Sequence, residues 1–250
     1  MNLFASEWIK TRSVRSTWLL AAATIVVTAL VSLLGISGLS ADWQRELPAD
    51  FDPVGVSFKG ILVGQLLMAM LGAQAVTSEY ASGQITSTLA IAPRRTRLFT
   101  AKALVTASIT AVVAVTTVAA SFTAGQAALA ATGLPTASTN DGDTVRALAC
   151  AIVYLVLSAV LGLAFGTLTR SSSGALAIVV SVALLVPALA PGLPGIVGRF
   201  AGTLWPTTAG QASYTVAGSG IPPLLGLAVM AVFTVWMTAA AVTTLRVRDA

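Results

Sequence analysis

Long stretches without any charged residue dominate the sequence. Six of them are at least 19 residues long, at 16–41, 60–78, 103–140, 147–169, 171–198 and 200–245. A helix needs about 20 apolar residues to cross about 30 Å of hydrocarbon, so each stretch can hold one span. The stretches lack the period-two alternation of a membrane β-barrel wall. They therefore predict an all-α integral membrane protein with six transmembrane helices.

The expected spans follow from these stretches once their Gly, Pro, Ser and Thr-rich flanks are set aside. They lie at about 17–39, 57–77, 99–131, 147–168, 173–191 and 223–245. Because the spans follow one another along the whole chain, we expect a single transmembrane domain over residues 1–250.

Composition agrees with this class of protein. The chain of 250 residues is 56% hydrophobic and 9% charged, whereas soluble domains carry about 25% charged residues. Disordered proteins need low hydrophobicity, and a disulfide scaffold needs paired cysteines, whereas Cys150 stands alone. Of these classes of protein, only a membrane-embedded protein agrees with the composition.

The basic residues predict the orientation of the chain. With the N-terminus inside, ten of the 14 Lys and Arg residues fall in the inner segments, as the positive-inside rule requires. We therefore expect both termini to be cytoplasmic and the protein to lie in the plasma membrane. The first apolar run is too long for a cleaved signal peptide. No basic patch interleaved with aromatic residues indicates nucleic-acid binding.

The residue types present exclude several kinds of chemistry. The chain contains no His, and none of its three lysines (Lys10, Lys59 and Lys102) follows a glycine as in a Walker A loop. The charge-free spans also lack the proton-relay residues of many carriers, although sodium coupling through carbonyls and hydroxyls needs no charge. No catalytic, metal-binding or cofactor-binding residue is expected in this chain. A partner would then supply the energy for any transport.

The largest inner connection, about 78–98, reads S-E-Y-A-S-G-Q-I-T-S-T-L-A-I-A-P-R-R-T-R-L. Ala81, Ile85 and Leu89 recur every fourth residue and predict a short amphipathic helix. Glu79 is expected in its first turn, where the helix dipole favours a carboxylate. Pro93 is expected to end this helix and to open the next one. We interpret the segment as a docking element.

The same segment resembles the cytoplasmic stretch after the second span in type-2 ABC exporter permeases. The shared features are an acidic residue, a glycine, a leucine, a Pro-x-Arg and a downstream lysine. Their positions here are Glu79, Gly83, Leu89, Pro93, Arg95 and Lys102. The start, S-E-W-I-K-T-R-S-V-R-S-T-W, resembles the interfacial helix of that family.

The resemblance implies a coupling helix that fits a cleft on a separate ABC ATPase subunit. The docking residues would be Glu79, Gly83, Ile85, Leu89, Pro93 and Arg95. Two ATPase copies would bind ATP and Mg²⁺, and two permease copies, as a homodimer or a heterodimer, would enclose the path. Family members also have short re-entrant helices between spans five and six, where 191–223 is rich in Gly and Pro and poor in charge.

Other polar and apolar patterns are consistent with this layout. Phe4, Trp8 and Ile9 share one arc of a helix over 1–15, which predicts an amphipathic helix lying in the membrane interface. Gln65 and Gln74 need partners in lipid and either glue helices together or line a substrate path.

The sequence thus predicts the permease subunit of an ATP-driven exporter for a hydrophobic or amphipathic substrate, such as a drug, an antibiotic peptide or a lipid. Two alternatives stay open. One is a membrane scaffold or accessory subunit that transports nothing, and the other is an ion-coupled secondary carrier.

Overall fold

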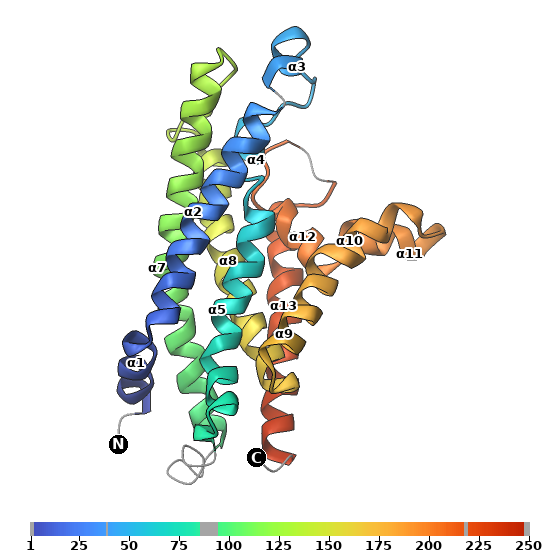
Figure 1. The fold of residues 1–250 in the computed structure, drawn as a ribbon. Helices are drawn as coiled ribbons and strands as arrows, with labels where there is room; N and C mark the ends of the chain where they lie inside the picture. Colours follow the sequence, from blue (N-terminus) through green and yellow to red (C-terminus); the bar gives the residue numbers. More distant parts are fainter. Residues whose placement is uncertain (1–2, 39, 86–94, 218–219, 248–250) are drawn as a thin grey trace.

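The computed structural model describes residues 3–38, 40–85, 95–217 and 220–247, and every regular element among them is a helix (Figure 1). Six helices in this part are long and apolar enough to cross a membrane. They are α2 (Arg15–Ser37), α5 (Ile61–Ala81), α7 (Arg95–Ala131), α8 (Gly142–Thr169), a composite helix over Ser172–Gly192, and α13 (Pro223–Val247). The prediction of an all-α, six-span membrane protein is confirmed.

The centre of the bundle is formed by α5, α7 and α8, which are more buried than the other three spans. The most extensive contact joins α5 to α8. A Cβ added to Gly162 on α8 would overlap the backbone of Ala69, and one added to Gly64 would overlap Thr28 on α2. The two G-x-x-x-G pairs, Gly60/Gly64 and Gly162/Gly166, therefore permit close packing on two sides of α5.

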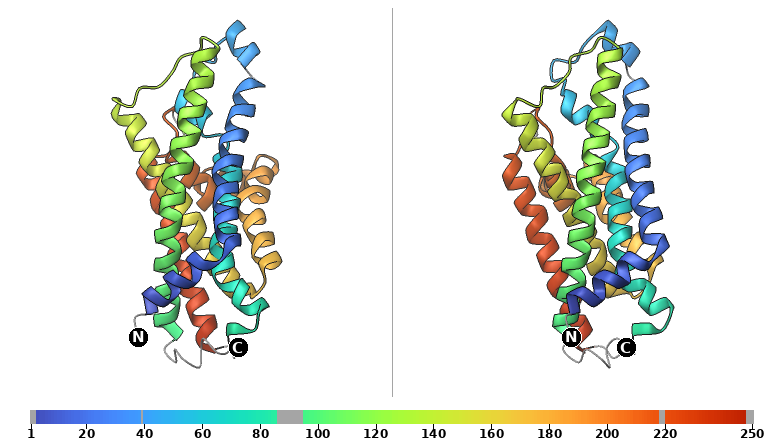
Figure 2. Two further views of the ribbon diagram at one scale, coloured as in Figure 1. Left: turned by 60° about the vertical axis from the view of Figure 1, so that its left-hand side comes forward. Right: turned by 90° about the vertical axis from the view of Figure 1, so that its left-hand side faces the viewer.

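The helix ends differ from the expected span limits. The second span lies about four residues later than 57–77, and α7 begins at Arg95 rather than at 99. With 37 residues, α7 is about 55 Å long at 1.5 Å per residue, and Figure 2 shows it running along the height of the molecule. Asp141 caps α8 by accepting a hydrogen bond from the Asp143 amide, so this helix starts five residues earlier than expected. Charge-free length could not locate these ends because the helices continue into polar sequence.

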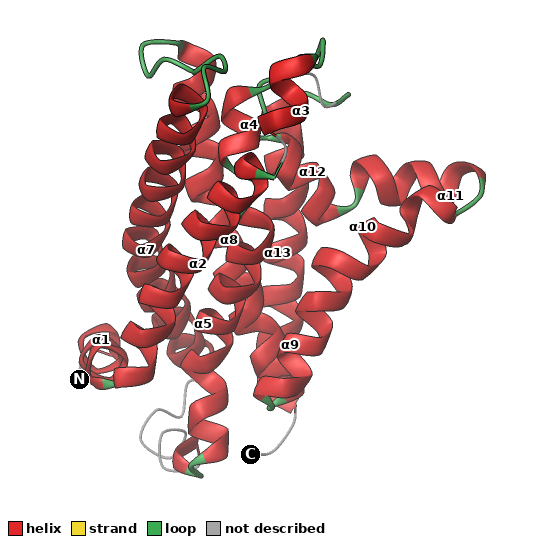
Figure 3. Ribbon diagram, turned by 45° about the horizontal axis from the view of Figure 1, so that its top comes forward, coloured by secondary structure: helices red, strands yellow, loops and turns green. Residues whose placement is uncertain are grey.

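The fifth span is a broken helix. It consists of α9 (Ser172–Val180), a π-helical turn η1 (Ser181–Leu185), α10 (Val186–Leu189) and a 3₁₀ turn η2 (Ala190–Gly192). The chain then turns back through α11 (Gly195–Arg199), a second π-helical turn η3 (Phe200–Leu204) and α12 (Pro206–Ala212). Figures 1 and 3 show α10 and α11 projecting sideways from the bundle.

Hydrogen bonds tie this hairpin to the fifth span. The Val182 carbonyl in the π-helical turn accepts from Trp205 Nε1 at 2.7 Å and from Thr207 Oγ1 at 3.1 Å. Segment 191–223 is therefore largely structured, and its entry into the bilayer stays a prediction.

The connection from α2 to the start of α5 is fixed by hydrogen bonds. It contains α3 (Ser40–Arg45) and α4 (Pro53–Ser57). Asp52 caps α4 by accepting from the Val54 amide at 3.0 Å, and its other carboxylate oxygen accepts from the amides of Val216 and Ala217 at 2.7 and 3.2 Å. One carboxylate thus joins the first and last connections at this end.

The short helix α1 (Leu3–Ser13) meets α2 at Val14, where the backbone is extended. In Figure 2 it runs obliquely across the end of the bundle at which α13 finishes. Phe4 and Ile9 on α1 are 39% and 68% exposed, whereas Glu7 is buried. The apolar side thus faces outward, as expected of an interfacial helix, although its position in a membrane stays a prediction.

Candidate functional site

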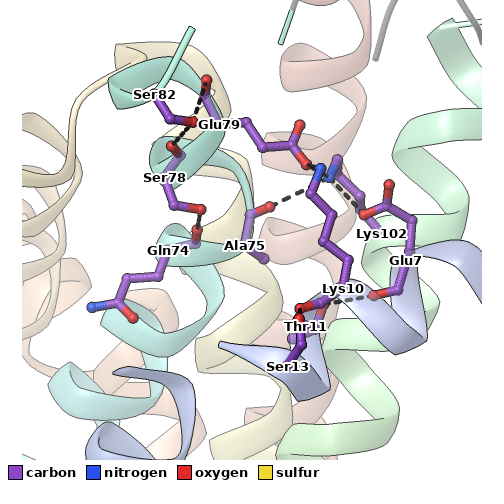
Figure 4. A network of polar contacts seen from close by, with 10 residues as sticks. All are labelled: Glu7, Lys10, Thr11, Ser13, Gln74, Ala75, Ser78, Glu79, Ser82 and Lys102. Atoms are coloured by element: carbon purple, nitrogen blue, oxygen red, sulfur yellow. Dashed lines mark hydrogen bonds and ion pairs between the residues drawn. The ribbon is translucent and has the colours of Figure 1, made fainter. Parts of the chain in front are cut away.

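Four charged side chains from three helices meet at the end of the bundle where α1 lies, here called the inner end (Figure 4). They are Glu7 and Lys10 of α1, Glu79 of α5 and Lys102 of α7, and together they form the ion cluster. Lys102 Nζ donates to Glu7 Oε2 at 2.6 Å and also to Glu79 Oε1. Lys10 Nζ donates to the same Glu79 oxygen. The cluster therefore links α1, α5 and α7.

Burial makes this cluster energetically sensitive. Glu7, Glu79 and Lys102 are only 6%, 2% and 4% exposed, and an isolated buried charge would lose several kcal/mol of hydration free energy. Two carboxylates and two ammonium groups balance each other, so each charge has an opposite partner. Removing Lys102 would leave Glu7 buried and without an ion-pair partner among the described residues.

The position of Glu79 corrects one expectation. We expected this residue in the first turn of a coupling helix, but it lies near the end of α5 and faces the ion cluster. Ala81, expected on the coupling helix, is also the last residue of α5. The predicted stripe is wrong at its start because the buried face of α5 continues as far as Glu79, whose charge Lys102 compensates.

The inner connection begins after this helix end. Gly83 has a positive φ of 70°, a conformation that ends many helices and that glycine adopts without strain. Ile85, two residues further, is helical and buried. The predicted docking residues Leu89 and Pro93 lie outside the described residues. We refer to residues 82–94 as the inner segment.

Arg95 is held where the inner segment ends. It begins α7, and its Nη1 donates to the Leu245 carbonyl of α13 at 2.6 Å. A guanidinium at a helix C-terminus meets the negative end of the helix dipole. Arg95 thus joins α7 to α13, a role that the sequence did not reveal.

The turn between α8 and α9 packs against the end of α5. The Arg170 guanidinium lies 5.4 Å from the centre of the Tyr80 ring, and Ser172 Oγ donates to Thr77 Oγ1 at 2.7 Å. Arg170 itself adopts a left-handed conformation that ends α8. The start of the inner segment is therefore next to α9 as well as α1 and α7.

The two predicted intramembrane amides lie in different places. Gln65 is buried, accepts a hydrogen bond from the Tyr154 hydroxyl of α8 and donates to the Leu62 carbonyl at 3.1 Å. It therefore joins α5 to α8. Gln74 lines a cavity beside the ion cluster. The two are not brought together into one path.

Sequence reasoning missed Glu7 and Lys10 as site residues because it treated the helix over 1–15 as an isolated interfacial helix. Their spacing of three residues next to an apolar arc was the available signal. It did not identify their partners, because Lys102 lies 95 residues from Glu7 and Glu79 lies 69 residues from Lys10 along the chain.

Comparison with known proteins identifies the family. The family described as ABC-2 family transporter protein matches residues 3–188, which include the whole ion cluster and the inner segment. No curated protein and no solved structure matches the chain. The chain therefore belongs to the ABC-2 transporter family, and it is a multi-pass membrane permease component of an ABC transporter.

Proposed function

We propose that this permease is an exporter subunit whose inner segment docks on a separate ABC ATPase. The observation that carries the proposal is the anchoring of both ends of that segment in the bundle. Glu79, three residues before the segment begins at Ser82, belongs to the buried ion cluster. Arg95, which follows the segment, is bonded to the end of α13.

This anchoring gives a physical route for motion. A displacement of the inner segment would pull on Glu79, and through Lys10 and Lys102 it would act on α1 and α7. At the other end, Arg95 would transmit it to α13. Because buried ion pairs are costly to separate, these helix ends would move together. ATP binding and hydrolysis by the partner could then switch access between the two sides.

The tight packing among α5, α8 and α13 supports a path between two copies rather than through one. The cavity bordered by Gln65, Ser158 and Met230 has a volume of only about 10 Å³, roughly the space for one water molecule. By contrast, large apolar side chains are exposed on the outer spans, among them Leu176, Leu185 and Val232. Two protomers, identical or related, would enclose a path suited to hydrophobic or amphipathic substrates.

The orientation in this proposal has both termini and the inner segment in the cytoplasm of a plasma-membrane protein. Two ATPase copies, each binding ATP and Mg²⁺, would attach there. The excess of basic residues at this end supports the orientation.

Reconstituted transport tests the function. The permease and its co-encoded ABC ATPase would be placed in proteoliposomes with ATPase domains outside, and uptake of a fluorescent amphipathic compound would be measured. We expect uptake that requires ATP and fails with a hydrolysis-deficient ATPase. Transport that persists without ATP but collapses with an ion gradient would indicate a secondary carrier. If the ATPase binds the permease but neither ATP nor an ion gradient drives transport of any compound that stimulates ATP hydrolysis, the chain is a scaffold.

A further inference from the structure

A cavity of about 590 Å³ lies beside the ion cluster at the inner end. Its walls come from α1, the first residues of α2, α5 and the residues just after it, α7, and the first residue of α9. Binding sites for small ligands typically have volumes of about 300–1,000 Å³. The docking proposal above does not use this space.

The cavity changes character along α5. Glu79 and Ser78 line one end, and Leu71, eight residues earlier, lies about 12 Å deeper at 1.5 Å per residue. Ile109, seven residues beyond Lys102 on the antiparallel α7, also lines the deep end. A polar end and an apolar end separated in this way suit an amphiphile.

The polar end holds a hydrogen-bond acceptor that the described residues do not satisfy. Both lysines of the ion cluster donate to Glu79 Oε1, whereas Glu79 Oε2 is buried and has no hydrogen-bond partner in the described part of the chain. Nearby hydroxyl protons are already used, because Ser78 and Ser82 donate to carbonyls of their own helix (Figure 4). An unsatisfied buried carboxylate oxygen is unfavourable, so a ligand that donates hydrogen bonds is favoured here.

The more exposed lysine of the ion cluster lies at the same end. The Lys10 side chain is 35% exposed, whereas that of Lys102 is 4% exposed. An ammonium group has three N–H donors and suits Glu79 Oε2, while a phosphate suits Lys10. A headgroup with both groups side by side matches this arrangement.

The level of the cavity indicates where such a ligand comes from. The neighbouring helix α1 exposes Phe4 and Ile9, which places it at the boundary between headgroups and acyl chains if it lies in the interface. Phospholipid headgroups occupy that level. We propose that the cavity binds a phospholipid with a primary ammonium headgroup, phosphatidylethanolamine, whose ammonium contacts Glu79, whose phosphate contacts Lys10 and whose acyl chain follows Leu71 and Ile109.

Native mass spectrometry of the purified, delipidated permease tests this site. The protein would be offered equal amounts of phosphatidylethanolamine and phosphatidylcholine with the same acyl chains. Phosphatidylcholine keeps the phosphate but has no N–H donor. We therefore expect the protein to retain about ten times more of the ethanolamine lipid than of the choline lipid, which corresponds to one decade in Kd. Glu79→Gln should remove this preference.

A second variant keeps the test independent of the ion cluster. Thr17 is buried and lines the cavity, so Thr17→Phe should fill it and reduce the bound lipid about tenfold, one decade in Kd. Leu30→Phe on the same helix, at a position that is 50% exposed, should change nothing.

Three results would overturn the proposal. The first is equal retention of phosphatidylethanolamine and phosphatidylcholine. The second is retention of phosphatidylglycerol equal to that of phosphatidylethanolamine, which would mean that only the phosphate is recognised. The third is unchanged lipid binding by the Thr17→Phe variant. The measurement uses the permease alone, so it is separate from any result on ATPase coupling.

Discussion

Lys102 Nζ on α7 donates to Glu7 Oε2 on α1 at 2.6 Å, although 95 residues separate the two in the chain. Both side chains are buried, and Lys102 also bonds to Glu79 at the end of α5. The contact fixes α1 to the bundle next to the start of the inner segment. The ion cluster is therefore both a structural joint and the proposed route for motion from an ATPase.

Lys102→Met should destabilise the inner end strongly. The variant leaves Glu7 without its ion-pair partner and Glu79 with Lys10 alone, and removing one partner of a buried pair costs about 3–5 kcal/mol. Thermal unfolding in detergent should show a clear decrease in Tm. Arg97→Met on the same helix is the control, because Arg97 is exposed and should tolerate the change.

A double-mutant cycle separates the pair from general effects of substitution. Glu7→Gln combined with Lys102→Met should be less destabilising than the sum of the single variants, because the two contact each other. Strict additivity would contradict the ion-pair assignment.

Gly162→Ala should loosen the contact between α5 and α8. The added Cβ would overlap the backbone of Ala69, and overpacking of this kind costs about 1–3 kcal/mol. Gly142→Ala is the matched control, since Gly142 is on the same helix and a Cβ there meets no atom within 4 Å. Equal Tm values for the two variants would disprove the close approach.

Tyr154→Phe should destabilise the bundle through Gln65. The hydroxyl donates to Gln65 Oε1 inside the core, and an unsatisfied buried acceptor costs about 1–3 kcal/mol. Adding Gln65→Leu to this variant should recover part of the loss, because no unpaired polar atom then remains. The Tm of the double variant measures this recovery. If adding Gln65→Leu to Tyr154→Phe lowers Tm as much as Gln65→Leu does alone, the hydrogen bond between the two residues is contradicted.

Asp52→Ala should release the connection before α13. The carboxylate accepts from the amides of Val216 and Ala217, and hydrogen bonds to a charged group contribute about 1.5–3 kcal/mol. Limited proteolysis from the outer side should cut near these residues faster in the variant. Asp50→Ala, at a neighbouring exposed carboxylate, should leave the cutting rate as in the original protein.

The six spans could be predicted because their signal is local. Charge-free length alone indicates a membrane helix, and the G-x-x-x-G pairs at Gly60 and Gly162 indicate close packing in the same way. Helix ends could not be located so well, since α7 has 37 residues and is longer than the roughly 20 residues that crossing the hydrocarbon requires. The break in the fifth span at Ser181–Leu185 also has no local sequence signal apart from the nearby Pro187.

The ion cluster depends on contacts between distant parts of the chain. Periodicity placed Glu79 on a short separate helix, because the neighbouring apolar positions Ile85 and Leu89 continue a four-residue spacing. Only the proximity of Lys102, itself buried among α1, α5 and α7, explains why a carboxylate lies on the inward face of α5. Pairing of this kind cannot be read from one sequence without its fold.

The most direct test of the account is photo-crosslinking from the inner segment to the ATPase. A benzophenone amino acid would replace Leu89 in membranes that also contain the co-encoded ABC ATPase, and Ile196, which is 76% exposed on the projecting hairpin, would carry it in the control. Irradiation should give a permease–ATPase adduct from position 89 and none from position 196. Absence of the adduct from position 89, while the two proteins still co-purify, would contradict docking through the inner segment.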